Sequence, residues 1–560
     1  MKNKFFLLLA VFFLGTMLRF YELGNFPISL HRDEAFLGYN AYSILKTGKD
    51  MSDNLLPMHL ESFIYSPAGY SYFSIPFIAI FDLNEFSVRT ASAFFGSLTI
   101  LVIYFLARQL FTHELSRISS RIDTNTLAFL AAFFLAVSPW HINLSRTATE
   151  NIIVVFFLLL GVLFFLIYLK NGYRYLFLSF LFFGITLLLY QAPRAFLPIF
   201  IPFLILVFME RKKIIKDKLI LGFFYLLAII LPTILILVSP DLSLRIRSLS
   251  IFHNDYTNTV LTEQITNDGV ARLPYIATRI FHNKIIGHSL LFLENYFKHF
   301  NFDFLFLQNG FPDRYRVPMM GLLYIFELPL IFLGLTYLFQ KNKRLGIFLL
   351  GWILITPIGS ALTSDDIPNL QRTLIGFPPY VFLSAFGLIS LLGLGRRSFG
   401  IFIFPMIFIV IYGLGYYLVQ YYSQAVNYKT WYRQDGYKNL VYKVNELLPK
   451  YEKAIITNTE SAPTVFFLFY NKYDPSLFQK ATYLSSHRSF DRMNFGKYEF
   501  TEDECPLKNE EDGGAARSSG VKNILYVNSA LCKEFPENSE LLAEIRRRDN
   551  SSVFYILDSK

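Results

Sequence analysis

The chain has 560 residues, of which 53% are hydrophobic and only 17% are charged, and its net charge is +10. Soluble globular domains carry roughly 25% charged residues, so this composition excludes an ordinary soluble protein. The basic residues lie in short loops between apolar segments, which argues against a nucleic-acid partner and predicts that the chain is surrounded by membrane lipids.

The apolar residues are grouped in segments long enough to cross about 30 Å of hydrocarbon as helices. With the N-terminus inside, the loops around Lys212 and Lys341 lie on the cytoplasmic side, as the positive-inside rule requires. Residues 1–18 are then a retained first span rather than a cleaved signal peptide, with Arg19 as an interfacial stop. We predict an all-α domain over residues 1–420 with about eleven spans, near residues 4–20, 88–110, 125–139, 151–169, 175–190, 196–209, 219–238, 320–340, 346–362, 373–393 and 400–420.

This orientation predicts an integral protein of the plasma (inner) membrane whose loops 21–87 and 239–319 are extracytoplasmic. The first of these loops contains a helix of its own, because Leu37, Ala41 and Ile44 recur at helical spacing and Gly48 ends the pattern. At about fourteen residues this helix is too short to span a bilayer. We therefore expect it to lie on the membrane surface with one face in the lipid interface.

The tail from residue 421 to residue 560 is richer in charged residues and predicts a small extracytoplasmic α/β domain. Helical spacing occurs at residues 435–449 and 463–470, and β-prone segments occur at residues 454–457, 524–527 and 553–557. The chain has two cysteines, Cys505 and Cys532, both in this tail. They leave open either a disulfide or two free thiols.

Two adjacent carboxylates, Asp33 and Glu34, begin the helix of the first outer loop, close to the expected headgroup plane. Adjacent residues of a helix point about 100° apart, so the two side chains cannot share one task. One interpretation is a general base that faces a cleft, next to a structural partner. The alternative is that both carboxylates only complement the helix dipole.

An ordered set of segments extends beyond this pair. It comprises HRDEAFLGYNAYSILKTGKD, LPMHLESFIYSPAGYSYFSIPFIAIF, LNEFSVRTASAFFGSLTILVIYFLARQLF, SPWHINLSRTATEN and LYQAPRAFLP. The set resembles the polytopic GT-C glycosyltransferases, in their protein O-mannosyltransferase and aminoarabinose-transferase branch. The resemblance covers residues 1–240 well and residues 320–420 loosely. It implies that Asp33 is the general base, with Glu34 beside it.

The resemblance also implies the reaction, which is inverting transfer of a sugar from a polyprenyl-phosphate donor to a hydroxyl of a protein, lipid or glycan acceptor. A non-enzymatic lipid-glycan transporter is the alternative function. Transporters place charged sites near the midplane of the membrane, whereas the polar residues here gather at one interface. No Walker loop, GxGxxG fingerprint, CxxC pair or HExxH motif is present.

One box departs from the family pattern. The family usually has Lys-Pro-Pro-Leu-Tyr where residues 66–70 read SPAGY, so the phosphate-binding lysine is absent. Some relatives have a metal-binding carboxylate just before that lysine, and Tyr65 stands there. The sequence therefore indicates no certain cofactor and makes a divalent metal doubtful, although His59 and Glu61 could serve as ligands.

Departure of the sugar leaves a phosphate anion, which a guanidinium group binds through two parallel hydrogen bonds. Arg146, Arg194 and Arg372 lie on the predicted outer side, against the positive-inside trend. Each could instead be a snorkelling anchor at the interface. The further residues that we expect to line the same cleft are His59, Tyr65, Tyr70, His141, Glu150, Tyr190, Gln191 and Asp365.

Overall fold

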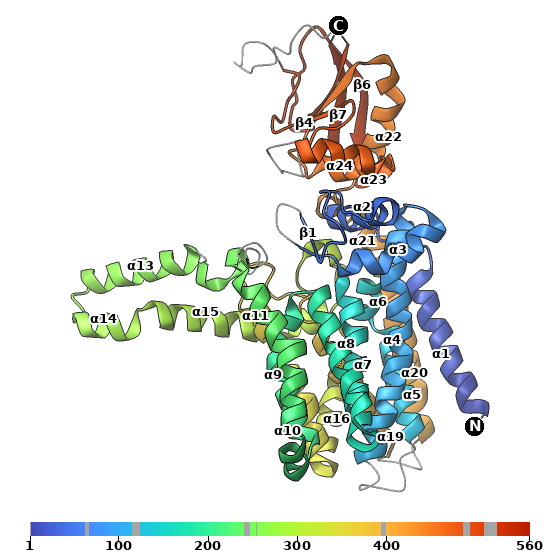
Figure 1. The fold of residues 1–560 in the computed structure, drawn as a ribbon, viewed down its shortest axis with the longest axis vertical. Coiled ribbons are helices and arrows are strands. Elements are labelled where there is room, and N and C mark those ends of the chain that lie inside the picture. Colours follow the sequence, from blue (N-terminus) through green and yellow to red (C-terminus); the bar gives the residue numbers. More distant parts are fainter. Residues whose placement is uncertain are drawn as a thin grey trace. The chain divides into compact units, whose positions relative to one another are not determined.

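The structure is a computed structural model, and its helices account for most of the chain (Figure 1). It describes residues 2–61, 66–114, 124–239, 243, 247–253, 255–393, 399–484, 493–508 and 523–559. Two compact units emerge. Unit 1 comprises Met1–Arg19, Ala93–Ser145 and Glu150–Gln420, and unit 2 comprises Phe20–Ser92, Arg146–Thr149 and Tyr421–Lys560.

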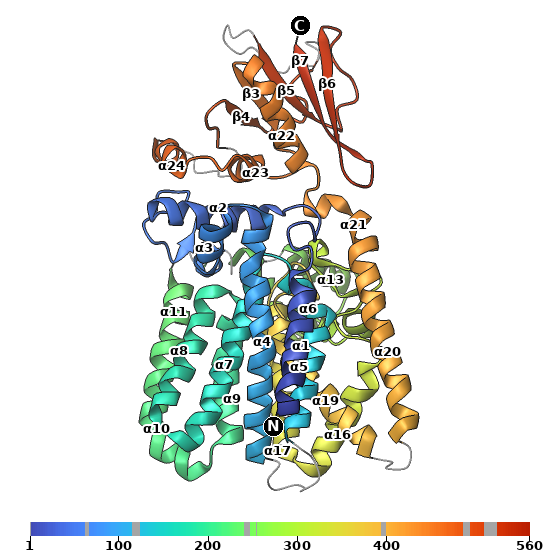
Figure 2. The same ribbon diagram turned by 90° about the vertical axis from the view of Figure 1, so that its right-hand side faces the viewer.

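Unit 1 is a bundle of apolar helices, and Figure 2 shows α7, α8 and α10 running side by side. A π-helical turn, Leu226–Ile230, continues α10 into α11. The helices of the bundle are α1 (Lys2–Phe20), α4 (Glu85–Glu114), α5 (Thr124–Val137), α6 (Pro139–Ser145), α7 (Glu150–Asn171), α8 (Tyr173–Leu189), α9 (Ala192–Phe208), α10 (Arg211–Tyr225), α11 (Leu231–Val238), α16 (Glu327–Lys341), α17 (Lys343–Ile355), α18 (Ile358–Ala361), α19 (Phe377–Gly393) and α20 (Phe399–Val419).

Each of the eleven apolar segments predicted as a span contains a helix, which confirms the predicted fold class. The number of spans is a separate matter. In the part of the chain that the structure describes, six helices are long and apolar enough to cross a membrane, or seven if the bent pair α5 and α6 is one span. Several of the other apolar helices, including α8 and α9, are shorter. The chain is therefore an integral membrane protein. Judged by helix length and composition, six or seven spans are present among the described residues, fewer than the eleven predicted.

Small residues allow the helices of unit 1 to pack closely. A Cβ atom on Gly334 of α16 would collide with the Leu383 carbonyl oxygen of α19, and a Cβ on Gly387 would collide with the Leu330 carbonyl oxygen. Glycine at these positions lets the two backbones approach each other, as is common between helices in membranes.

Between α11 and α16, the described residues of the segment predicted only as a long loop form three α-helices, besides short 3-10 and π-helical turns. They are α13 (Asp255–Val270), α14 (Tyr275–Phe281) and α15 (Lys284–Lys298). We call them the arm.

Unit 2 contains the first predicted outer loop and the tail. Its sheet has the order β4-β3-β5-β7-β6, in which β3 is parallel to β4 and β5, and β7 is antiparallel to β5 and β6. The predicted strands and helices of the tail are present. The unpredicted elements of the tail include β4, β6 and α24. The bounds are β3 (Lys453–Thr457), β4 (Tyr498–Thr501), β5 (Ile524–Ser529), β6 (Ser539–Arg546), β7 (Ser552–Ser559), α22 (Tyr437–Leu447), α23 (Pro463–Tyr470) and α24 (Pro475–Leu484).

The two cysteines of the tail, Cys505 and Cys532, form a disulfide. Of the two possibilities that the sequence left open, the structure therefore has the bonded one.

The helix predicted in the first outer loop is α2 (Arg32–Thr47), and Gly48 ends it in the left-handed conformation with φ 74°. It packs against α3 (Gly69–Phe81), α23 and α24. These contacts correct one expectation, because Leu37, Ala41 and Ile44 are buried by protein and form no lipid-facing surface. The antiparallel strands β1 (His59–Leu60) and β2 (Ser66–Pro67) follow in the same loop.

Candidate functional site

The acidic pair lies in the first turn of α2, where a capping box fixes the backbone. The His31 side chain accepts a hydrogen bond from the Asp33 N–H at 3.1 Å, and the His31 N–H donates to Glu34 Oε2 at 3.1 Å. The two carboxylates then diverge, as adjacent helical residues must. The side chain of Asp33 is 45% exposed, whereas that of Glu34 is completely buried.

Glu34 forms a buried ion pair with Arg89, at the start of α4. The Arg89 Nε donates to Glu34 Oε1 at 3.1 Å, and the Ala148 N–H donates to the same oxygen at 2.8 Å. Burial acts to raise the pKa of Glu34, but the charge of Arg89 and its hydrogen bonds outweigh burial and keep this pKa below its ordinary value. Glu34 is therefore ionised, and its carboxylate oxygens accept hydrogen bonds from His31, Arg89 and Ala148.

Arg89 also holds the chain segment that precedes α2. Its guanidinium donates to the carbonyl oxygens of Leu23, Pro27 and Ser29, at 3.2, 2.9 and 2.7 Å. Our sequence prediction missed this residue, although it lies within a predicted span. A charged side chain inside a predicted span usually pairs with another polar group, and that signal could have identified the pair.

The neighbours of Asp33 are basic. Its Oδ2 lies 3.4 Å from His31 Nδ1, and its Oδ1 lies 3.7 Å from Arg32 Nε. The carboxylate thus combines solvent access with a backbone that the Glu34–Arg89 pair fixes. A carboxylate in this position can accept a proton from an incoming hydroxyl group.

Arg146 is fully buried in unit 2. Its Nε donates to the Tyr421 hydroxyl at 3.2 Å, and one of its terminal nitrogens donates to the Phe26 carbonyl at 3.2 Å. The guanidinium also lies 5.2 and 5.3 Å from the ring centres of Tyr421 and Tyr422. These contacts make it a cation held between aromatic rings.

Arg194 lies in the first turn of α9, in unit 1. Its Nε and one terminal nitrogen donate to the Leu187 carbonyl at 3.2 and 3.1 Å, near the end of α8. These bonds satisfy a carbonyl group that the end of a helix leaves open. The partly exposed Tyr190 and Gln191 form the break between the two helices.

Arg372 ends a loop, residues 363–372, that several polar contacts hold in unit 1. Its guanidinium donates to Asp365 Oδ1 at 2.8 Å and to the Thr363 hydroxyl at 2.6 Å. Asn151, next to Glu150 at the start of α7, donates to the Gln371 carbonyl at 2.9 Å. The predicted residues Arg372 and Asp365 are therefore an ion pair.

The loop 363–372 lies close to the start of α9, because α18 leads into this loop and packs on the first turn of α9. A Cβ atom on Gly359 would lie 3.1 Å from the Ala195 Cβ. The structure thus brings the neighbourhoods of Arg194 and Arg372 together within unit 1.

Other predicted cleft residues lie in different surroundings. Tyr70 is buried and its hydroxyl donates to the Val88 carbonyl at 2.8 Å, so a cleft-lining role does not fit it. His141 is also buried, with Nδ1 2.9 Å from a nitrogen of Arg19, and a cleft-lining role does not fit it either. His59 is partly exposed in β1, and Tyr65 lies outside the described residues.

Arg19 was predicted to be an interfacial stop, and that prediction is wrong. Its side chain is completely buried and donates to the carbonyl oxygens of Gly15, Ala136 and Leu135, at 2.7, 3.1 and 3.2 Å. The residue therefore ties α1 to the end of α5.

A polar cavity lies within unit 2, beside the Glu34–Arg89 pair. Many of its charges are paired, for example Lys438 with Glu85 at 2.6 Å and Arg547 with Glu460 at 2.6 Å. The lining includes Gly24, Asn25, Ser29, Arg89, Asp435, Asn439, Arg546 and Arg548.

The predicted site residues belong to both units. Asp33, Glu34, His59, Glu61, Tyr70 and Arg146 are in unit 2, and the remaining described ones are in unit 1. Among the described residues, no group of three or more His, Cys, Asp or Glu side chains is arranged to hold a metal ion.

Comparison with known proteins gives a family model that matches part of the chain and a similar fold over nearly all of it. Residues 66–236 match the family model described as dolichyl-phosphate-mannose-protein mannosyltransferase. A comparison with curated protein sequences finds no match.

Three solved structures are similar to this chain. ArnT from Cupriavidus metallidurans in the apo state is 12% identical with a TM-score of 0.51, covering 99% of this chain and 96% of that chain. The same protein bound to undecaprenyl phosphate is 12% identical with a TM-score of 0.52, covering 100% and 97%. The apo oligosaccharyltransferase of Archaeoglobus fulgidus is 14% identical with a TM-score of 0.49, covering 83% of this chain, and this chain spans 63% of its length.

At this level of identity, the ArnT structures establish the fold over nearly the whole chain, and the family model independently matches the segment that begins at Ser66. A partial match to a mannosyltransferase family model and an ArnT-like fold both agree with the resemblance that the ordered motifs predicted.

Proposed function

We propose that this protein transfers a sugar from a polyprenyl-phosphate carrier to an acceptor hydroxyl, with inversion at the anomeric carbon. The observation that carries the proposal is the division between the two carboxylates of α2: Glu34 is sealed in an ion pair, and Asp33 is open to solvent. The family model, named for a dolichyl-phosphate-mannose donor, supports the donor class. So does the ArnT structure that holds undecaprenyl phosphate.

In the proposed reaction, Asp33 takes the proton of the acceptor hydroxyl while the oxygen forms a bond to the anomeric carbon. The bond between that carbon and the phosphate oxygen breaks, and the polyprenyl phosphate leaves with the electron pair. Phosphate is already a good leaving group, so no second catalytic acid is needed, in contrast to two-carboxylate glycoside hydrolases. Glu34 positions Asp33 and does not touch the substrate.

The departing phosphate requires a fixed positive charge. Of the three proposed arginines, Arg372 is the most accessible, with a side chain that is 13% exposed beside an Asp365 side chain that is 41% exposed. A phosphate could replace Asp365 at the guanidinium without burying a new charge. Arg146 and Arg194 remain proposed phosphate-binding residues. The hydrogen bonds described above for these two side chains go to protein groups, and both side chains are buried.

Replacement of Arg372 by lysine tests this assignment. Lysine keeps the charge but lacks the planar fork, so Arg372→Lys should weaken donor binding by about 1 to 3 kcal/mol, the scale of lost charge-assisted hydrogen bonds. The donor KM, kcat and thermal unfolding of the purified protein would be measured together.

Asp365→Asn is the matched control. If Arg372 only fastens its loop, this variant should show the same loss as Arg372→Lys. If Arg372 binds phosphate, Asp365→Asn should keep or strengthen donor binding, because the competing carboxylate charge is gone. Equal losses in the two variants would remove Arg372 from the phosphate site.

We further propose that unit 2 is extracytoplasmic and that the membrane is the plasma (inner) membrane. The disulfide between Cys505 and Cys532 supports this orientation, because disulfides persist in oxidising compartments and are rare in the cytosol. The basic loops at Lys212 and Lys341 support it independently. The acceptor hydroxyl would then belong to a protein, lipid or glycan outside the cell.

The reaction can be tested with the full-length protein in liposomes that contain undecaprenyl-phosphate mannose, or a pentose analogue of it, and an extract of envelope acceptors. We expect release of undecaprenyl phosphate together with a new glycosylated product, both detected by mass spectrometry. Movement of the intact lipid-linked sugar across the bilayer, without cleavage of either donor, would instead establish a transporter.

A further inference from the structure

The arm of unit 1 projects from the bundle rather than packing along it. Figure 1 shows α15 lying across the direction of α9 and α10. In the same view α13 lies beside α15, on the side away from the turn that joins α9 to α10. At its root, α15 contacts α18, which packs on the first turn of α9. The arm therefore leaves the bundle at the end where α9 begins.

The side chains of α14 and α15 form an exposed apolar stripe. On α15, Ile286, Leu290, Leu293 and Phe297 follow the spacing i, i+4, i+7, i+11 and thus share one face of the helix. Leu290 and Phe297 are each 60% exposed. On α14, Ile276, Ile280 and Phe281 are exposed as well. In water, a continuous apolar surface of this kind would be unfavourable.

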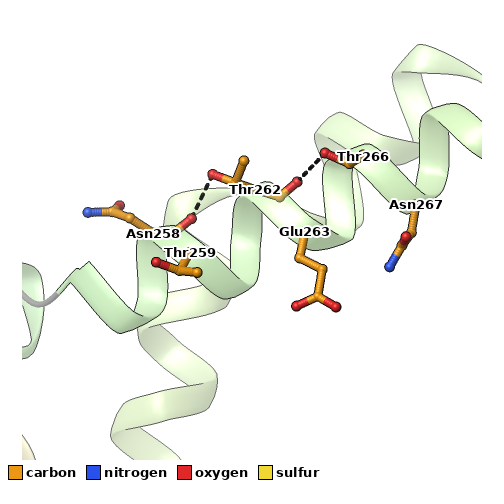
Figure 3. Close-up of a pocket in the computed structure, with 6 residues that line it drawn as sticks. All are labelled: Asn258, Thr259, Thr262, Glu263, Thr266 and Asn267. Atoms are coloured by element: carbon orange, nitrogen blue, oxygen red, sulfur yellow. Dashed lines mark hydrogen bonds between the residues drawn. The ribbon is translucent and has the colours of Figure 1, made fainter.

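The other helix of the arm has the opposite character. Figure 3 shows the six polar side chains that line a shallow hollow on α13, all from that one helix: Asn258, Thr259, Thr262, Glu263, Thr266 and Asn267. The Thr262 and Thr266 hydroxyls donate to carbonyl oxygens one turn earlier in the same helix, at 2.8 Å each. Leu261 of α13 is buried, and α13 contacts α15. The arm is thus two-sided: apart from Ile265 and Val270, the exposed side chains of α13 are mainly polar, whereas α14 and α15 expose an apolar stripe.

We propose that α14 and α15 lie in the membrane interface, at the end of the bundle where α9 begins, with their apolar stripe in the lipid and α13 in water. The bundle already crosses a membrane, and a helix that lies across the spans at this end runs in the plane of the interface. The charges fit lipid headgroups, because Arg279, Lys284 and Lys298 outnumber Glu294 on these two helices. The partner of the stripe is therefore a lipid surface that carries anionic headgroups.

The root of the arm is joined to the loop that contains Arg372. Asn295 of α15 donates to the Thr363 carbonyl at 3.1 Å, and the Asn369 N–H donates to His299 Nε2 at 3.2 Å. Burial lowers the pKa of His299 to about 4, so this imidazole is neutral at pH 7 and accepts that hydrogen bond. A membrane-bound arm would thus fix the loop 363–372 at the level of the lipid headgroups.

A depth measurement on the full-length protein tests the placement. The fluorophore NBD would be attached to a cysteine introduced by Leu290→Cys, or by Thr262→Cys as the matched control on α13. The protein would then be reconstituted in vesicles of phosphatidylcholine and phosphatidylglycerol. Quenching by lipids with a doxyl group near the headgroup should be at least about threefold stronger at position 290 than at position 262, and quenching by aqueous iodide should show the reverse order.

Strong iodide quenching at position 290 would place the stripe in water and overturn the proposal. Protection of position 290 from both quenchers would overturn it too, because a protein surface would then cover the stripe. Both labels replace exposed side chains, so neither should disturb folding. Leu293→Cys provides a second position on the same face and should behave as position 290 does.

Discussion

Asp33→Asn is expected to lower the rate of sugar transfer at least about a hundredfold, which is the low end for loss of a general base. The asparagine keeps the size of the side chain and its hydrogen-bonding capacity but cannot take a proton from the acceptor. Because Asp33 is 45% exposed and outside the buried Glu34–Arg89 pair, donor binding and thermal unfolding should change little. Single-turnover kinetics with saturating donor would measure the chemical step.

Asp53→Asn is the control for this prediction. Asp53 lies in the same loop and pairs with Lys49 at 2.7 Å on the surface, where an ion pair contributes about 0–1 kcal/mol. Its loss should leave the transfer rate within about twofold of the unmodified protein. Near-normal turnover by Asp33→Asn would show that another group accepts the proton, and the proposed division between the two carboxylates would then fail.

Apolar patterning predicted most of unit 1 because long hydrophobic segments have few alternatives to helices inside a membrane. The same reasoning could not fix the number of spans. Helices such as α8 and α9, of 17 residues each, are at the short limit for crossing a bilayer. Length alone does not separate a short span from a helix that only enters the membrane.

For α2, the sequence was informative about the helix and misleading about its surroundings. Local signals, namely the first-turn carboxylates and Gly48, correctly gave its two ends. The apolar face that suggested lipid contact is instead buried by protein, and α2 packs against α3 and against α23 and α24, which lie more than 400 residues later in the chain. A partner so distant in sequence leaves no trace in the periodicity of the helix itself.

The tail shows a similar limit at β6. Leu541, Leu542 and Ile545 recur at intervals of three and four residues, which favours a helix over the alternation of a strand. The segment is nevertheless an edge strand, because pairing with β7 determines its conformation. Tertiary contacts commonly override such local preferences.

The site residues were predicted unevenly for a comparable physical reason. Residue type and position made Asp33 and Glu34 candidates, but only burial distinguishes the exposed carboxylate from the buried one. The roles of Arg19 and Arg89 depend on carbonyl groups and a carboxylate contributed by other segments. No single sequence window contains both halves of these interactions.

The buried ion pair should have the largest effect on stability. Glu34→Gln removes the charge that compensates Arg89 and leaves hydrogen bonds from Ala148 and His31 poorly matched. Breaking a buried pair from one side typically costs about 3 to 5 kcal/mol, so unfolding in detergent should occur at a clearly lower temperature. Glu446→Gln is the control, because its partner Lys443 and the glutamate itself are on the surface; it should cost less than about 1 kcal/mol.

Two further readouts separate the loss of this ion pair from a general effect of substitution at position 34. First, the double variant Glu34→Gln, Arg89→Gln should lose less stability than the sum of the two single losses, because it leaves no uncompensated charge inside the protein.

Second, the pKa of Glu34 is held below its ordinary value of 4.5. The stabilisation that its charge gives to the folded state is therefore complete above pH 4.5 and declines as the pH falls through the lowered pKa. The gap in stability between the unmodified protein and Glu34→Gln should therefore narrow in acid. The ion-pair interpretation would fail if the two single losses added strictly and if the stability difference between the unmodified protein and Glu34→Gln did not change with pH. The rigid support proposed for Asp33 would then have to come from elsewhere in unit 2.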